Sequence, residues 1–112
     1  MSLTQGWRGL LVLALAGGYV FALLPPGPPG PDWFWQADKV RHAAAFVAFW
    51  WMARRCGWPA PRVLAVLLAY GVAIEVGQAF TPGRDPSLGD VLADAVGLAL
   101  GVWRWPPVRP AT

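Results

Sequence analysis

Charge is scarce in this sequence. Only 13% of its 112 residues are charged, against ~25% in a typical soluble domain, whereas 56% are hydrophobic. Intrinsic disorder is excluded, because disordered chains need high charge and few aromatic residues. A soluble globule is disfavoured by the same deficit, and a nucleic-acid-binding module by the scatter of the nine basic residues. The composition therefore predicts a small integral membrane protein in one domain.

Cysteine is nearly absent as well. Cys56 is the only one, so the chain can form neither an internal disulfide nor a cysteine-based zinc site. The packing of apolar helices must therefore hold the fold together.

Apolar runs separated by prolines, glycines and charges make up most of the chain. A helix of roughly 17–25 residues crosses the ~30 Å hydrocarbon core of a bilayer. The runs predict an all-α bundle of four transmembrane helices in one domain over residues 1–112, at about 7–24, 38–53, 62–80 and 88–104. The second helix spans only if its flanking basic side chains reach the interfaces. The first has a competing interpretation as a cleaved signal peptide, but too few apolar residues precede its A-x-A site, so we expect it to be retained.

Basic residues are distributed unevenly between the two sides of such a bundle. The side that holds both termini and the second connection carries six basic residues and no acidic one: Arg8, Arg54, Arg55, Arg62, Arg104 and Arg109. The other side carries three of each sign: Lys39, Arg41, Arg84, Asp32, Asp38 and Asp85. Because Lys and Arg accumulate on the cytoplasmic side, both termini are predicted to be cytoplasmic. Six of the eight tryptophans lie near the same interface: Trp7, Trp50, Trp51, Trp58, Trp103 and Trp105.

Polar residues gather at the outer ends of the predicted helices. We expect seven of them to form a binding cluster: Lys39, His42, Glu75, Gln78, Arg84, Asp90 and Asp94. Asp90 and Asp94 are four residues apart, and Glu75 and Gln78 are three apart, so each pair shares a helix face. Buried carboxylates are costly without cationic partners, which favours a structural salt-bridge cluster. Ionisable residues within a membrane also mark functional sites by default, and the two interpretations are compatible.

The cluster lacks a known catalytic or metal-binding motif. His42 and the carboxylates are ligand types that suit divalent ions, but no H-E-x-x-H pattern supports them, so neither a metal nor a cofactor is predicted. Glu75 and Asp90 suit general acid–base chemistry, yet no nucleophile is recognisable beside them. Ser87 is interpreted as the N-cap of the fourth helix, with Asp90 as the acidic end of an S-x-x-D capping box.

Small residues recur every four positions along the fourth helix, at Ala93, Gly97 and Gly101. Such a stripe lets another backbone approach closely. We expect it to serve helix packing within the chain first and contact in a homo-oligomer second.

Three segments together resemble the VanZ-like family of small bacterial membrane proteins. They are Asp38-Lys39-x-x-His42 followed by Phe46, then Glu75-x-x-Gln78-x-Phe80-x-Pro82-Gly83-Arg84, and Asp90-x-x-Ala93-x-x-x-Gly97-x-x-x-Gly101. The resemblance covers about residues 38–101 and implies a four-helix membrane bundle with shared polar residues at Lys39, His42, Glu75, Gln78, Arg84 and Asp90. The chain departs from the pattern at Asp94, where the family usually has asparagine.

The family takes its name from a member linked to low-level teicoplanin resistance, which implies a role at the bacterial cell envelope without naming an activity. We expect a non-enzymatic, multi-pass protein of the bacterial inner (cytoplasmic) membrane. Its outward cluster would bind the headgroup of an anionic lipid or a cell-wall precursor. Two alternatives stay open: a membrane-embedded hydrolase of envelope lipids with Glu75 or Asp90 as general base, and a structural or assembly subunit that docks through the glycine stripe of the fourth helix.

Overall fold

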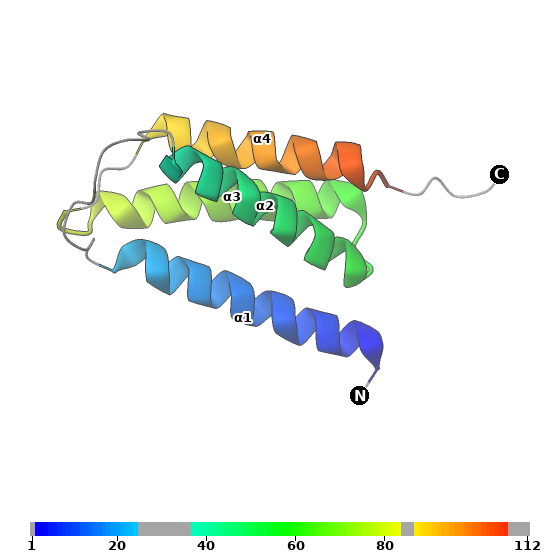
Figure 1. The fold of residues 1–112 in the computed structure, drawn as a ribbon. Helices are drawn as coiled ribbons and strands as arrows, with labels where there is room; N and C mark the ends of the chain where they lie inside the picture. Colours follow the sequence, from blue (N-terminus) through cyan, green and yellow to red (C-terminus); the bar gives the residue numbers. More distant parts are fainter. Residues whose placement is uncertain (1, 25–36, 84–86, 108–112) are drawn as a thin grey trace.

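Four helices make up the part of the chain that the computed structural model describes, which is residues 2–24, 37–83 and 87–107. They are α1 (Leu3–Leu23), α2 (Ala37–Arg55), α3 (Ala60–Ala79) and α4 (Leu88–Arg104), shown in Figure 1. No strand occurs within these residues. The prediction of an all-α chain with four helices is therefore confirmed, while the proline-rich segment at 25–31 lies outside the described residues.

The first helix begins at Leu3, earlier than the sequence pattern suggested, because polar residues cap it. The Ser2 hydroxyl accepts a hydrogen bond from the Gln5 N–H at 3.1 Å, and the Gln5 side-chain oxygen accepts one from the Ser2 N–H at 2.8 Å. This reciprocal capping box satisfies amide groups that the first turn leaves without partners. The apolar run that predicted this helix does not include the two capping residues.

A tight turn joins α2 to α3. Gly57 adopts a left-handed conformation with φ of +84°, which a residue without a Cβ reaches at no steric cost. Pro59 then caps α3, and Pro61 lies in its first turn, where a missing N–H costs no helical hydrogen bond. The chain therefore reverses within a few residues, and α2 and α3 run antiparallel (Figure 1).

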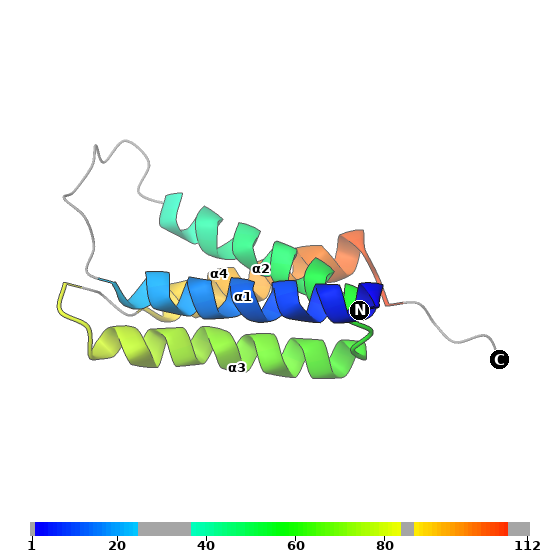
Figure 2. The ribbon, with the colours of Figure 1, turned by 90° about the horizontal axis from the view of Figure 1, so that it is seen from below.

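The helices share two ends. In Figures 1 and 2, the start of α1, the α2–α3 turn and the last turn of α4 lie at one end of the bundle. We call this the arginine–tryptophan end, defined by Trp7, Trp51, Arg54, Arg55, Trp58, Arg62, Arg104 and Trp105. We call the opposite one the carboxylate end, defined by Lys39, His42, Glu75, Ser87, Asp90 and Asp94. The alternation is that of an up-and-down bundle, and α1 packs against α2 and α3 at its side (Figure 2).

The tightest packing joins α2 and α4. Gly97 is buried so closely that a Cβ there would overlap the carbonyl group of Ala43, and a Cβ at Gly101 would lie 2.8 Å from the Trp50 side chain. Trp50 is fully buried, and its indole N–H donates to the Trp105 carbonyl at 3.1 Å. The small-residue stripe of α4 is thus filled by α2 of the same chain.

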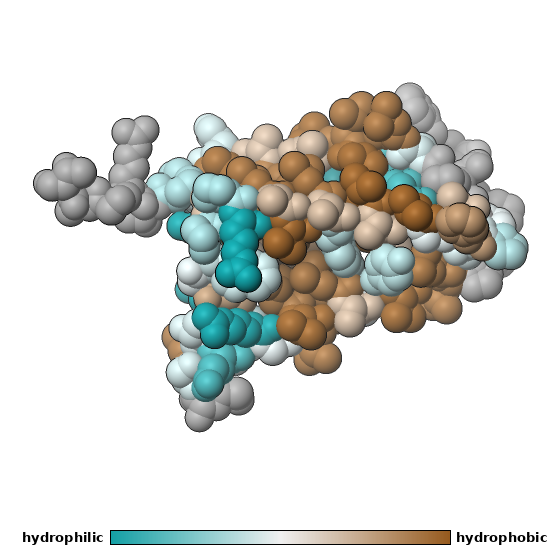
Figure 3. Space-filling view, turned by 180° about the vertical axis from the view of Figure 1, so that it is seen from behind, coloured by the Kyte–Doolittle hydropathy of each residue, from teal (hydrophilic) through white to brown (hydrophobic). Residues whose placement is uncertain are grey.

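Apolar side chains also cover the outside of the bundle. Leu11 is the one buried residue of α1, whereas Leu13 and Phe21 are more than 70% exposed. Figure 3 shows hydrophobic residues over the middle of the rear face and large hydrophilic side chains at the arginine–tryptophan end. Two helices, α1 and α3, are long and apolar enough to cross a membrane. Four spans and cytoplasmic termini stay predictions.

Candidate functional site

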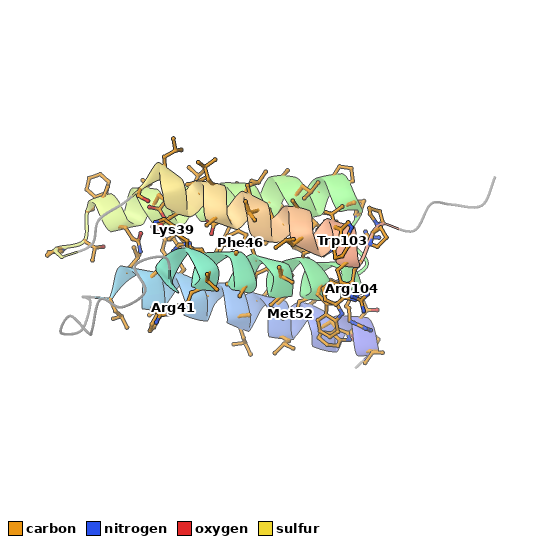
Figure 4. All side chains as sticks on the ribbon, turned by 45° about the horizontal axis from the view of Figure 1, so that its top comes forward. Lys39, Arg41, Phe46, Met52, Trp103 and Arg104 are labelled. Atoms are coloured by element: carbon orange, nitrogen blue, oxygen red, sulfur yellow. The ribbon has the colours of Figure 1, made fainter. Side chains whose placement is uncertain are left out.

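The carboxylate end brings together polar side chains from three helices. Lys39 of α2 donates a hydrogen bond to Asp90 Oδ1 of α4, and its ammonium lies 3.4 Å from the Ser87 hydroxyl. Asp90 is only 4% exposed, so this ammonium compensates a carboxylate that has lost most of its water. Figure 4 shows Lys39 at the start of α2, on the side that faces α4, whereas Arg41 points away from α4.

The two aspartates of α4 face both nitrogens of the His42 ring. Asp94 Oδ1 lies 2.8 Å from His42 Nδ1, and Asp90 Oδ2 lies 3.8 Å from His42 Nε2. Because a carboxylate accepts hydrogen bonds, an ionised Asp94 at this distance favours the tautomer of His42 that carries its proton on Nδ1. Asp94 is 1% exposed, so the carboxylate that stands where the family usually has asparagine orients the histidine from inside the bundle.

Glu75 of α3 completes the site from the third side. It is 8% exposed, and its Oε2 accepts a hydrogen bond from the Ser87 N–H at 2.8 Å. Its other oxygen, Oε1, is buried and has no hydrogen-bond partner among the described residues. Polar atoms of His42, Glu75 and Asp90 all lie within 4.8 Å of one another. Three side chains that can each offer a ligand atom therefore converge on one point.

The cap of α4 differs in part from its prediction. Ser87 is the N-cap, as predicted, and its hydroxyl accepts a hydrogen bond from the Asp90 N–H at 3.1 Å. The predicted capping box is wrong, because the Ser87 N–H donates to Glu75 and not to the Asp90 side chain. The ammonium of Lys39 draws the Asp90 carboxylate toward α2 instead.

Two predicted cluster residues are not placed with these side chains. Gln78 is buried, and its amide donates to the Ala22 carbonyl of α1 at 3.0 Å, so it joins α3 to α1. Arg84 lies outside the described residues. The structure thus brings together Lys39, His42, Glu75, Asp90 and Asp94.

Gly71 belongs to the site, although the sequence analysis did not single it out. A Cβ on Gly71 would lie 2.6 Å from Asp94 Oδ2 and 3.4 Å from the Phe46 ring. The glycine therefore makes the space that the Asp94 carboxylate occupies against α3. Its position four residues before Glu75, on the same helix face, was the signal available in the sequence.

An open groove of about 410 Å³ runs beside this cluster between α2 and α4. Its walls are Val40, Ala43, Gly89, Leu92, Ala93 and Val96, and Lys39 stands at the end nearest the cluster. The Lys39 side chain is 35% exposed, so its charge is accessible from the groove. The arrangement suits an amphipathic molecule with an apolar tail and an anionic end.

Comparison with known protein families identifies a relationship for this chain. The model of the VanZ/LLP1 family matches residues 7–109, which is nearly the whole chain. No curated protein and no solved structure matches it. The match reaches back into α1, beyond the segments whose residues carry the resemblance.

Proposed function

The chain belongs to the VanZ/LLP1 family, and on that premise we propose that it binds the phosphate-bearing headgroup of a lipid in the bacterial envelope. The family and the two apolar helices indicate a membrane protein. We propose further that all four helices span the inner membrane, with both termini in the cytoplasm. The carboxylate end would then face the outer surface, where envelope lipids and cell-wall precursors present their headgroups.

Contacts at the arginine–tryptophan end support this orientation. The Arg55 guanidinium lies 4.3 Å from the centre of the Trp51 ring and 5.5 Å from that of Trp7. Arg62 stacks in the same way on Trp58, at 5.3 Å. Guanidinium groups over aromatic rings suit the headgroup region, where the rings are amphipathic and the cations meet anionic lipids. Arginines favour the cytoplasmic side, so this end is the inner one.

The observation that carries the binding proposal is the apolar groove that ends at Lys39. An acyl or polyprenyl tail in the groove would bring a phosphate to the Lys39 ammonium. Asp90 fixes the position of that ammonium, so little side-chain freedom is lost on binding. Arg84, three residues before Ser87 in the sequence, would add a guanidinium that can bind phosphate through two hydrogen bonds.

A binding role fits this site better than hydrolysis. Ser87 is the hydroxyl nearest to the carboxylates among the described residues, and it is engaged by the Asp90 N–H and the Lys39 ammonium. Attack by this hydroxyl on a substrate would require it to give up its role as the cap of α4. Gly97 and Gly101 pack against α2, so the stripe does not favour a docking subunit either.

Native mass spectrometry of the detergent-solubilised protein tests the proposal. The probes are phosphatidylglycerol, a polyprenyl pyrophosphate and zwitterionic phosphatidylcholine, and the two anionic probes separate a phospholipid from a cell-wall carrier. Lys39→Gln removes the charge but keeps a donor for Asp90, and we expect it to lose at least tenfold in retention of the anionic lipid. Ala93→Phe, which fills the groove, should have a similar effect on every lipid that enters it.

Arg41→Gln is the matched control, because Arg41 lies two residues away on α2 and is exposed. It should retain lipid like the wild type. Equal retention by the wild type and Lys39→Gln would contradict the proposal, as would an equal loss in Arg41→Gln.

A further inference from the structure

We propose that the carboxylate end is a divalent metal site, in which His42, Glu75 and Asp90 bind one ion of the Zn²⁺ class. This inference goes beyond headgroup binding and holds in the absence of any lipid. It rests on the convergence of the three side chains and on the buried Glu75 oxygen that has no hydrogen-bond partner among the described residues.

The distances suit a single ion after a small adjustment. Ligands that lie 2.0–2.2 Å from a tetrahedral zinc ion are roughly 3.4 Å from one another. Here His42 Nε2 and Asp90 Oδ2 are 3.8 Å apart, and the three candidate ligand atoms lie within 4.8 Å of one another. Closing these gaps takes about 1 Å of side-chain movement, which the broad terminal torsions of Glu and His permit. The helices need not move.

Each proposed ligand is already held by a second contact. His42 Nδ1 is bonded to Asp94, Asp90 Oδ1 to Lys39, and Glu75 Oε2 to the Ser87 N–H. Metal sites in proteins are built in this way, with a carboxylate on the distal nitrogen of the histidine and hydrogen bonds on the distal oxygens of the carboxylates. His42 Nε2 and Asp90 Oδ2 lie 3.8 Å apart, and Glu75 Oε1 has no hydrogen-bond partner among the described residues. A salt-bridge cluster that served stability alone would not leave a buried carboxylate oxygen without a partner.

The charges of the described side chains also favour a bound cation. Glu75, Asp90 and Asp94 are all at least 92% buried, and Lys39 is the one ammonium that the described contacts bring to them. With a neutral imidazole, the five side chains carry a net charge of −2 when the carboxylates are ionised. A buried carboxylate oxygen without a partner is costly, and a dication at the common point would neutralise the excess.

The ligand set selects the kind of ion. One imidazole nitrogen and two carboxylate oxygens suit Zn²⁺ or a similar first-row ion, whereas Mg²⁺ and Ca²⁺ prefer all-oxygen sites. The three ligands come from α2, α3 and α4, so a bound ion would tie these helices together at one end of the bundle. A fourth position stays open, as in sites where zinc binds a water or a substrate oxygen. A lipid phosphate can occupy such a position.

Isothermal titration of the chelator-treated protein with Zn²⁺, in detergent without added lipid, tests the site. We expect one ion per chain, with Mg²⁺ bound at least a hundredfold more weakly. Glu75→Gln keeps the size and shape of the side chain and should lose at least tenfold in affinity. Asp94→Asn, which weakens the support of His42, should lose about tenfold to a hundredfold. Titration with Co²⁺ should give visible d–d absorption that Glu75→Gln reduces.

Cys56→Ala is the control, because a thiol is the other side chain that could take zinc. Cys56 is buried at the opposite end of the bundle, and burial raises the pKa of its thiol, which disfavours the thiolate that zinc needs. The variant should bind zinc like the wild type. Absence of zinc binding in the wild type, or unchanged binding in Glu75→Gln, would overturn the proposal.

A thermal melt separates loss of the site from loss of the fold. Zn²⁺ should raise the Tm of the wild type and of Cys56→Ala, but not that of Glu75→Gln, whose own melt shows whether it is folded. Since no lipid is present, the titration can succeed where the headgroup proposal fails, and the reverse also holds.

Discussion

The two ends of this bundle use charge in opposite ways. At the arginine–tryptophan end, Arg55, Arg62 and Arg104 are exposed and lie over aromatic rings, so each keeps access to water. At the carboxylate end, Asp90 and Asp94 are buried and depend on partners from α2. The first set consists of separate contacts that can be lost one at a time. The side chains of the carboxylate end form a network. Removing one of them leaves the charge or hydrogen-bonding group of another without a partner. The charges of one end are therefore independent of one another, and those of the other end are interdependent.

A substitution at Gly97 should have the largest effect. The contact between α2 and α4 depends on this glycine, and the carboxylate end depends on that contact. Gly97→Leu should lower the free energy of unfolding by more than ~3 kcal/mol, because its side chain would meet the Ala43 backbone, which cannot rotate away. Urea unfolding in mixed micelles measures the loss. Gly101→Ala is the milder comparison, since its Cβ meets the Trp50 side chain. Equal stability of Gly97→Leu and the wild type would show that α2 and α4 do not pack as described.

Removing one aspartate tests the network itself. Asp94→Ala should lower the free energy of unfolding by about 3 kcal/mol, because it leaves His42 without its buried partner. Asp94→Asn keeps an oxygen that accepts from His42 Nδ1 and should cost less than half as much. The same unfolding titration compares the two. An equal loss in the two variants would mean that the charge, and not the hydrogen bond, holds the histidine.

Gly71 and Gly77 provide a matched pair on α3. Gly71→Ala should cost about 1–3 kcal/mol, because its Cβ would come 2.6 Å from the Asp94 carboxylate, which is held in place by His42. Gly77→Ala meets the end of the Leu23 side chain of α1 at 2.7 Å, and this side chain can turn aside. Thermal melts should therefore show a clearly larger fall in Tm for the first variant. A larger fall in Tm for Gly77→Ala would mean that the contact of α3 with α1 is the more rigid of the two.

Arg55 provides the corresponding test at the arginine–tryptophan end. Arg55→Ala removes a cation from two ring faces but leaves no buried group without a partner, so it should cost less than ~1 kcal/mol. Melting of the purified variant beside Asp94→Ala gives the contrast directly. A loss equal to that of Asp94→Ala would mean that the two ends do not differ in kind.

The smallest expected effect is on growth. Expressed in a susceptible Gram-positive host, the wild type should protect slightly against teicoplanin and not against vancomycin, whereas Glu75→Gln and Arg84→Ala should not protect. Arg55→Ala should protect like the wild type at a matched membrane level. If all the variants protect equally, the carboxylate end has no part in the effect.

The sequence predicted the helices well and the contacts between them only in part. Apolar runs bounded by prolines and charges indicate helices, because these features act locally. Ser87 was recognised as a cap for the same reason. The partner of its amide was not, since Glu75 lies on another helix. Gln78 was placed with Glu75 from their spacing, yet residues three apart on a helix differ in direction by about 60°, which is enough to turn Gln78 toward α1. Gly71 was missed because its spacing from Glu75 places it on the same helix face but does not show that Asp94 of another helix lies against it.

The contact between Ser87 and Glu75 bears on the order in which the chain folds. These residues are 12 positions apart, so α3 and α4 close their own turn early and at a small entropic cost. The contacts of Lys39 and His42 with α4 span 51 and 52 positions and need the hairpin to exist first. During synthesis, α2 therefore leaves the ribosome before α4, the partner that Lys39 and His42 contact. The carboxylate end can therefore assemble only after α4, which supplies Asp90 and Asp94, has been made.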